Sequence, residues 1–176
     1  MDTTRVLAAD IAAHEGAGVT VSGWVHRIRD LGGITFVLLR DRSGLVQLVY
    51  DTPPELHNET VVSVQGTVAA NEKAPSGFEV QVAETTILGS ADSDLPLSVN
   101  QNVDNVGIDA ILDHRIISLR NPQIRHIFEL QASVVKYFAE WLRDQDFTEI
   151  KSSKIIGSGT EGGTGLFSVD YFGDTV

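Results

Sequence analysis

The sequence contains no cysteine, which excludes disulfide bonds and thiolate metal sites. Its first residues lack the basic and apolar regions of a secretory signal peptide, and no apolar run approaches the roughly 18 residues that a membrane span requires. These absences predict a cytoplasmic protein without a membrane segment. Basic residues are also scarce, because 13 Lys and Arg stand against 24 Asp and Glu, and the 176 residues carry a formal net charge of −11.

Apolar patterning predicts a small β-barrel in the first half of the chain. The hydrophobic content of 42% is sufficient for a folded core. Turn-forming residues such as Asp, Ser, Gly and Pro separate short apolar or alternating runs. Five short strands favour an OB-fold barrel over a sandwich, which needs seven or more. The expected strands cover residues 19–26, 34–39, 45–50, 61–68 and 78–82.

The pattern changes after the barrel. Residues 89–107 are rich in Ser, Asp, Asn and Pro, which is typical of a linker. Asn121 and Pro122 supply a helix N-cap and a first-turn proline, and apolar residues at helical spacing follow for over twenty residues. Two further strands are expected at 147–150 and 154–156, before a glycine-rich loop at 157–165.

A basic cluster lies inside the first expected hairpin. Four of the 13 Lys and Arg residues fall between positions 27 and 42, namely Arg27, Arg29, Arg40 and Arg42. A local positive surface on an acidic protein favours the phosphate backbone of a nucleic acid as its partner.

Several separated motifs occur in one order along the chain. They read GWVHRIRDLGG, FVLLRDRSGLVQ, GFEV, FTEIKSSKI, GSGTEGGTGLF and YFG. Together they resemble aspartyl-tRNA synthetases of the archaeal type, in which an anticodon-binding OB-fold precedes a class II catalytic domain. The resemblance implies an aspartate–tRNA ligase, with the OB-fold at 1–88, a linker or hinge at 89–120, and the α+β beginning of the catalytic domain at 121–176.

The resemblance assigns five residues to the tRNA anticodon. Phe36 corresponds to an aromatic residue that stacks on the central base, and Gln47 to a glutamine that reads its edge. Glu79 corresponds to a glutamate that completes the reading, while Arg27 and Arg29 correspond to arginines that meet the anticodon loop. Stacking combined with edge hydrogen bonds is how proteins read splayed single-stranded bases.

Each assignment has a structural alternative. Phe36 fits an inward core residue of a half-buried strand, and Glu79 fits a solvated strand residue. Arg40 and Arg42 fit structural pairs with nearby carboxylates such as Asp30 and Asp41, and they are therefore left out of the expected site.

Two positions bear on tRNA choice. In the family that the chain resembles, two positions vary with tRNA recognition. A His after the GWV-like strand and a Pro before the GFE-like strand occur with relaxed recognition, and Trp and Lys at these positions occur with strict recognition. His26 and Pro75 resemble the non-discriminating type, which aspartylates both tRNA(Asp) and tRNA(Asn). The alternative is an exposed strand histidine and an ordinary turn proline.

The second half resembles the beginning of a class II domain. Residues 121–154 are similar to motif 1, whose long helix builds a homodimer interface, although a plain core helix fits the same stripe. Ser153 stands where the family has a proline, and so does Ser168. Glu161, in the TEGG string, matches the family glutamate that binds L-aspartate.

Motifs 2 and 3, which bind ATP and Mg²⁺ in the family, lie beyond Val176. We therefore expect the chain to be an N-terminal portion of the enzyme, with no catalytic or metal-binding residue of its own. Two alternatives stay open: a stand-alone OB-fold RNA-binding module with a dimerising helix, and an asparaginyl-tRNA synthetase.

Overall fold

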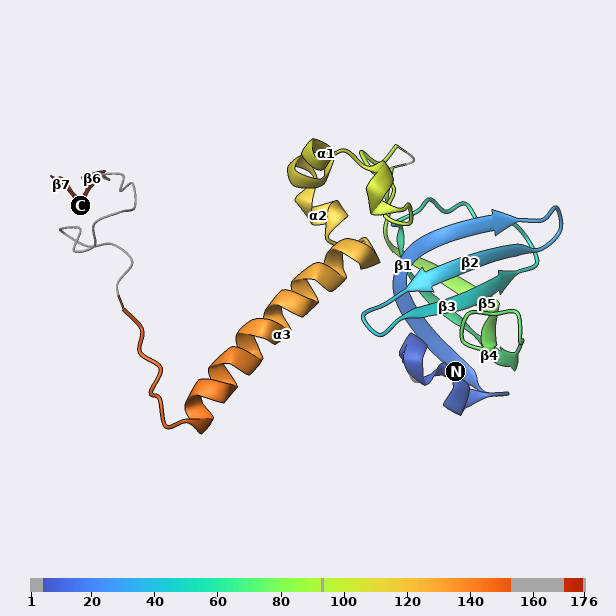
Figure 1. Ribbon diagram of the computed structural model, residues 1–176. Helices are drawn as coiled ribbons and strands as arrows, with labels where there is room; N and C mark the ends of the chain where they lie inside the picture. Colours follow the sequence, from blue (N-terminus) through green and yellow to red (C-terminus); the bar gives the residue numbers. More distant parts are fainter. Residues whose placement is uncertain (1–4, 93, 153–169, 176) are drawn as a thin grey trace. The chain divides into compact units, whose positions relative to one another are not determined.

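Five strands form a closed barrel in the first half of the chain (Figure 1). The structure is a computed structural model that describes residues 5–92, 94–152 and 170–175. Around the barrel the order is β1-β2-β3-β5-β4, with β3 and β5 parallel and the other pairs antiparallel. The OB-fold prediction is confirmed. The strands are β1 (Gly18–Asp30), β2 (Thr35–Arg40), β3 (Leu45–Tyr50), β4 (Val61–Ala70) and β5 (Phe78–Gly89).

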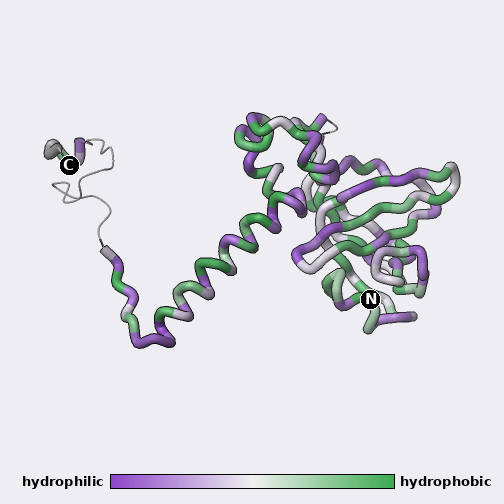
Figure 2. Tube along the Cα trace, in the orientation of Figure 1, coloured by the Kyte–Doolittle hydropathy of each residue, from purple (hydrophilic) through white to green (hydrophobic). Residues whose placement is uncertain are grey.

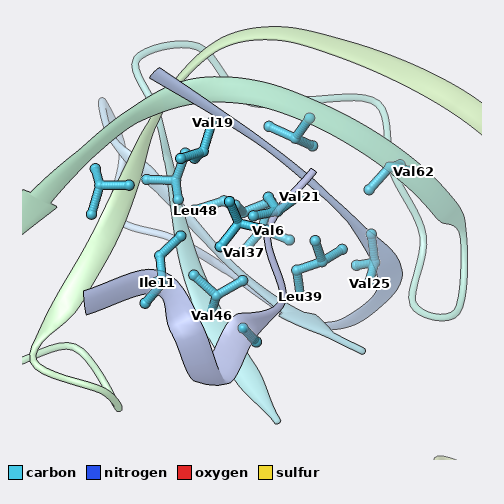
Figure 3. Packing of buried hydrophobic residues seen from close by; sticks show 14 of the residues in the cluster. Val6, Ile11, Val19, Val21, Val25, Val37, Leu39, Val46, Leu48 and Val62 are labelled. Atoms are coloured by element: carbon cyan, nitrogen blue, oxygen red, sulfur yellow. The ribbon is translucent and has the colours of Figure 1, made fainter. Parts of the chain in front are cut away.

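The barrel interior is filled mainly by β-branched and leucine side chains (Figure 3). Alternate residues of each strand face inward, because side chains point to opposite faces of a strand in turn. Leu39 and Leu48 are at most 1% exposed, as is Ile11 from the 3₁₀ helix η1 (Ala8–His14), which packs against β1, β3 and β4. The core therefore includes a short helix that the strand pattern did not indicate.

Two glycines allow the barrel to close. A Cβ atom on Gly23 would collide with the backbone carbonyl oxygen of Arg40, and one on Gly66 would collide with that of Gln81. Both glycines lie where one strand crosses closely over another, and a side chain there would force the strands apart.

Asp41 fastens η1 to the turn between β2 and β3. Its Oδ2 accepts a hydrogen bond from the backbone N–H of Ala8 at 2.8 Å, and its Oδ1 accepts from Ser43 and Gly44. Burial raises the pKa of Asp41, but these hydrogen bonds outweigh it, so the pKa lies below its ordinary value. The carboxylate is thus held charged where it joins two segments.

The chain divides into two compact units, residues 1–126 and 127–176. The first unit also contains η2 (Val103–Asn105) and two short helices that the sequence analysis did not predict, α1 (Ile108–Asp113) and α2 (Arg115–Ser118). The predicted long helix is present as α3 (Pro122–Asp144), and Asn121 caps it by accepting from the N–H of Gln123 at 2.9 Å. Hydrophilic and hydrophobic positions alternate along α3 (Figure 2).

The end of the chain differs from the expectation. Residues 147–150, predicted as a strand, follow α3 without pairing to another strand within the described residues. A strand needs a hydrogen-bonded neighbour, and the sequence pattern alone supplies none. The described part ends with the short pair β6 (Asp170–Tyr171) and β7 (Asp174–Thr175). The expected strand at 154–156 and the loop at 157–165 lie outside the described residues. None of the described helices combines the length and apolarity needed to cross a membrane.

Candidate nucleic-acid interface

The outward side chains of β1, β2, β3 and β5 lie in register across one face of the barrel. Arg29 stands opposite Phe36, and Phe36 stands opposite Val49. One step along the ladder, Gln47 stands opposite Glu79 on the parallel strand β5. Because directly paired residues point to the same side of a sheet, the predicted anticodon residues of three strands share this face with Arg29.

A β-bulge at His26 brings both arginines onto the same face. Val25 pairs with Leu39 inside the barrel, whereas Arg27 pairs with Leu38 on the outside, so His26 is an extra residue in β1. The extra residue reverses the alternation of the strand. Without it, Arg27 would lie on the same side as buried Val25; with it, Arg27 and Arg29 are exposed.

Phe36 lies on the outside of the barrel. Its neighbours along β2, Thr35 and Val37, are both at most 1% exposed, whereas Phe36 itself is half-buried. Figure 3 shows Val37 among the core side chains. The structure thus does not place Phe36 in the interior, and part of the residue is exposed to solvent.

The carboxylate of Glu79 accepts three side-chain amide hydrogen bonds. Gln47 donates through Nε2 at 2.9 Å, Asn71 through Nδ2 at 2.6 Å and Gln81 through Nε2 at 2.8 Å. Glu79 is only 7% exposed, so it is not the solvated strand residue of the alternative interpretation. Since one amide hydrogen of Gln47 is used, its carbonyl oxygen and its second hydrogen can serve another partner.

The loop that contains Pro75 is tied to this network. Asn71 starts the loop: its backbone N–H donates to the carbonyl of Gly77 at 2.8 Å, and its carbonyl accepts from the N–H of Ala74 at 2.9 Å. Ala74 is buried and Pro75 is exposed. Because the Asn71 side chain also bonds Glu79, the loop and the Gln47 side chain are held by one carboxylate.

His26 belongs to a different cluster. Its Nδ1 lies 2.8 Å from Nη1 of Arg40, and Nη2 of Arg40 lies 2.8 Å from Oε2 of Glu59. The same oxygen accepts from Nη1 of Arg120 at 2.9 Å. Burial lowers the pKa of His26, and the charges of Arg40 and Arg27 lower it further, against an opposing effect of Glu59.

The prediction that Arg40 pairs with Asp30 or Asp41 was wrong. Arg40 pairs with Glu59, nineteen residues away, whereas Asp41 binds η1 and the turn, and Asp30 accepts from the N–H of Gly32 at 2.9 Å. Its exclusion from the RNA-facing set is supported, because Arg40 is only 7% exposed. Arg42 is exposed.

The sequence analysis also missed the residues that orient the site. Asn71, Glu59 and Arg120 gave no periodic signal, since each acts through a contact with another strand or connection. Gln81 lies in the alternating pattern of β5, but nothing in that pattern indicated its bond to Glu79. Glu161, the expected aspartate-binding residue, and Ser153 and Ser168 lie outside the described residues. Among the residues that the structure describes, no group of three or more His, Asp and Glu could hold a metal ion.

Comparison with known proteins finds relatives for both halves of the chain. The family of OB-fold nucleic acid binding domains matches residues 19–88, and the class II tRNA synthetases (D, K and N) match residues 107–173. An aspartate–tRNA(Asp/Asn) ligase from Archaeoglobus fulgidus is 40% identical over 96% of this chain, which corresponds to 41% of the relative. The ligase of the same name from Methanopyrus kandleri is 44% identical over 90% of the chain and 39% of the relative.

The chain is a homologue of aspartate–tRNA(Asp/Asn) ligases, which it matches at 40–44% identity over 90–96% of its length. It combines the anticodon-binding OB-fold of a class II synthetase with a part of the catalytic domain. A solved structure of the asparaginyl-tRNA synthetase from Pyrococcus horikoshii, complexed with asparaginyl-adenylate, superposes with a TM-score of 0.81 at 26% identity and covers 93% of this chain and 39% of that one. The chain spans about two fifths of the length of the relatives it matches.

Proposed function

We propose that the chain reads the anticodons of tRNA(Asp) and tRNA(Asn) for an aspartate–tRNA ligase. The observation that carries this proposal is the shared face of Arg27, Arg29, Phe36, Gln47 and Glu79, which come from four strands of the barrel. The resemblance to aspartyl-tRNA synthetases gives these residues a role, and the strand register, which sets them on one face of the barrel, supports it.

Phe36 and Gln47 read the central anticodon base. They are diagonal neighbours on β2 and β3, and such residues lie about 7–8 Å apart with their Cβ atoms somewhat closer, so a base stacked on the ring lies beside the amide. Stacking contributes about 1–3 kcal/mol per base. Glu79 acts as a positioning residue, because its bond to Gln47 Nε2 fixes which way the amide points.

Arg27 and Arg29 bind phosphates of the anticodon loop. They are exposed on the strand next to Phe36, and they provide local positive charge on a chain of net charge −11. Their contribution is electrostatic and falls as salt rises.

His26 and Pro75 allow the protein to bind both tRNAs, whose anticodons differ only in the last base. Support comes from the two relatives described above, whose names include both tRNA(Asp) and tRNA(Asn). A proline at the exposed tip of an anchored loop and a neutral imidazole at a bulge both present fixed surfaces to that base.

The longer protein would catalyse ATP-dependent aspartylation. L-Aspartate would contact Glu161, and ATP with Mg²⁺ would activate it, but the described residues include no metal-binding cluster and we assign no step through these groups to this chain. In this proposal the OB-fold domain covers residues 1–88, the linker or hinge residues 89–120, and the beginning of the catalytic domain residues 121–176. The protein acts in the cytoplasm.

A homodimer through α3 is part of the proposal. Along this helix Ile127, Leu130, Val134, Phe138 and Trp141 are each at least 59% exposed and recur at spacings of three and four residues. Apolar residues at that spacing form one stripe along a helix, as in helix pairs that bury it together.

An asparaginyl-tRNA synthetase is the second candidate, because the Pyrococcus horikoshii enzyme of that name shares this fold at 26% identity. The higher identity to aspartate ligases, 40–44%, favours aspartate. Amino-acid-dependent exchange of pyrophosphate into ATP by the gene product that includes motifs 2 and 3 decides between them: exchange with aspartate supports the proposal, and exchange with asparagine alone refutes it.

The RNA-binding proposal is tested with the 176-residue chain and labelled anticodon stem-loops. We expect stem-loops with the anticodons GUC and GUU to bind with similar affinity. A stem-loop in which the central U of the anticodon is replaced by A should bind more weakly. Equal binding of all three would show that the barrel does not read the anticodon.

A further inference from the structure

The contact between Arg40 and His26 fixes the tautomer of the imidazole. Nη1 of Arg40 lies 2.8 Å from Nδ1 of His26. A guanidinium can only donate hydrogen bonds and stays protonated, so Nδ1 must be the acceptor. The neutral ring then carries its hydrogen on Nε2, and its other polar atom is a donor only.

Arg40 is itself held in place. Its Nη2 donates to Oε2 of Glu59, which also accepts from Arg120, and the Arg40 and Glu59 side chains are 9% and 4% exposed. The guanidinium of Arg120 lies 5.6 Å from the ring centre of Trp24, a cation–π distance. Turning Arg40 away from His26 would break its charged contact with a buried carboxylate, which is costly.

The backbone of His26 is fixed as well. Asn100 donates to its carbonyl oxygen through Nδ2 at 2.7 Å, and the residue forms the bulge immediately before Arg27. The charged groups that act on the imidazole are Arg40 from β2, Glu59 from the connection before β4 and Arg27 from β1. Burial and the two arginines keep the pKa of His26 below its ordinary value, so the ring is neutral near pH 7.

We propose that Arg40 is a positioning residue that presents His26 as a donor-only imidazole to the O2 atom of the last anticodon base. This inference rests on the proposed function, in which that base is C or U. The two pyrimidines share the O2 carbonyl and differ at position 4, where cytosine has an amine and uracil a carbonyl. A donor that binds O2 accepts both bases, which gives the relaxed choice a chemical cause.

The first test needs no RNA. Long-range ¹H–¹⁵N correlation spectra of the 176-residue chain near pH 7.5 distinguish the two neutral tautomers, and the His26→Gln variant identifies the His26 signals among five histidines. We expect a single Nε2–H tautomer for His26. An Nδ1–H form, or an average of both forms, overturns the inference.

Removing the positioning group should release the tautomer. In Arg40→Met we expect both tautomers of His26, whereas Arg5→Met, which removes an exposed arginine, should leave the spectrum unchanged. Unaltered His26 signals in folded Arg40→Met would overturn the role of Arg40. If that variant does not fold, an Nδ1–H tautomer in the unmodified protein would still overturn the inference.

The second test replaces O2 with sulfur, a weaker acceptor, in the last base of the GUC and GUU stem-loops. We expect 2-thio substitution to weaken binding of either stem-loop about 2- to 13-fold, as for the loss of one hydrogen bond. His26→Leu, which leaves no donor at this position, should reduce this sensitivity, and His57→Leu, which changes an exposed histidine, should retain it.

The two tests separate this inference from the function on which it rests. If the stem-loops bind but the sulfur has no effect, the contact with O2 is refuted and anticodon binding stands. If no stem-loop binds although His26 shows the Nε2–H tautomer, the proposed function fails and the contact fails with it.

Discussion

Replacing Phe36 by alanine separates the two interpretations of this residue. The ring is half-buried on the outer face, and its direct cross-strand neighbours are Arg29 and Val49. If it stacks on a base, its removal costs about 1–3 kcal/mol of binding, which is about a 5- to 150-fold weaker Kd. Fluorescence anisotropy with a GUC stem-loop at about 0.1 M salt measures this change.

The effect on folding should be smaller than for a core residue. Phe36→Ala removes contacts on only one side of a strand, so we expect less destabilisation than the roughly 3–5 kcal/mol typical of a fully buried phenylalanine. Leu48→Ala, at a position that is 0% exposed, provides the comparison and should cost about 2–5 kcal/mol. Urea unfolding followed by circular dichroism gives both values.

A matched control removes an exposed apolar side chain elsewhere on the barrel. Ile87 lies on β5, is 52% exposed and pairs with β4, so Ile87→Ala should leave the Kd unchanged. The stacking argument is refuted if Phe36→Ala binds the stem-loop as tightly as Ile87→Ala does. It is also refuted if Phe36→Ala unfolds as easily as Leu48→Ala, which would identify the ring as part of the core.

Three further predictions concern charge. Changing Arg27 and Arg29 together to glutamine should reduce the slope of log K against log salt for stem-loop binding by about 1.4, at about 0.7 per phosphate contact; an unchanged slope contradicts the phosphate role. Folding lowers the pKa of Asp41, so the charged carboxylate stabilises the folded chain above the unfolded pKa of 3.8, and this stabilisation is lost as the pH falls through the folded pKa. In acid, the urea midpoint of Asp41→Asn should therefore vary less with pH than that of the unmodified chain. Because folding lowers the pKa of His26, the histidine of the unfolded chain is protonated at a higher pH than that of the folded chain. The contribution of His26 to folding stability is therefore complete above pH 6.5 and decreases as the pH falls below 6.5. His26→Gln should weaken this pH dependence, and an equal dependence of stability on pH in both proteins would contradict the argument.

The strands could be predicted because their signal is local. Short apolar or alternating runs gave all five, with ends within a few residues in most cases, although β1 and β5 extend further, to Asp30 and Gly89. The N-cap of α3 was equally local, since Asn121 bonds the N–H two residues ahead. Such features depend on neighbours in sequence and need no knowledge of the fold.

The contacts that orient the site could not be predicted in this way. Arg40 was expected to pair with a carboxylate close in sequence, but Glu59 reaches it from another connection of the barrel. The burial of Glu79 similarly results from Asn71 and Gln47, which only the closed barrel brings to it. Charge and periodicity identify candidate residues, whereas partner choice is decided by the order of strands around the barrel.

The bulge at His26 shows how one such non-local feature builds two surfaces. β1 pairs with β4 from Gly18 to Trp24 and with β2 from Trp24 onward, so the extra residue lies just after the strand changes its partner. Beyond the bulge the alternation is reversed, and this turns Arg27 outward to join Phe36. At the bulge the imidazole contacts Arg40, which pairs with Glu59, and Glu59 also pairs with Arg120. A strand with strict alternation would have placed Arg27 on the core side, and the basic residues of this hairpin could not then have shared a face with Phe36 and Gln47.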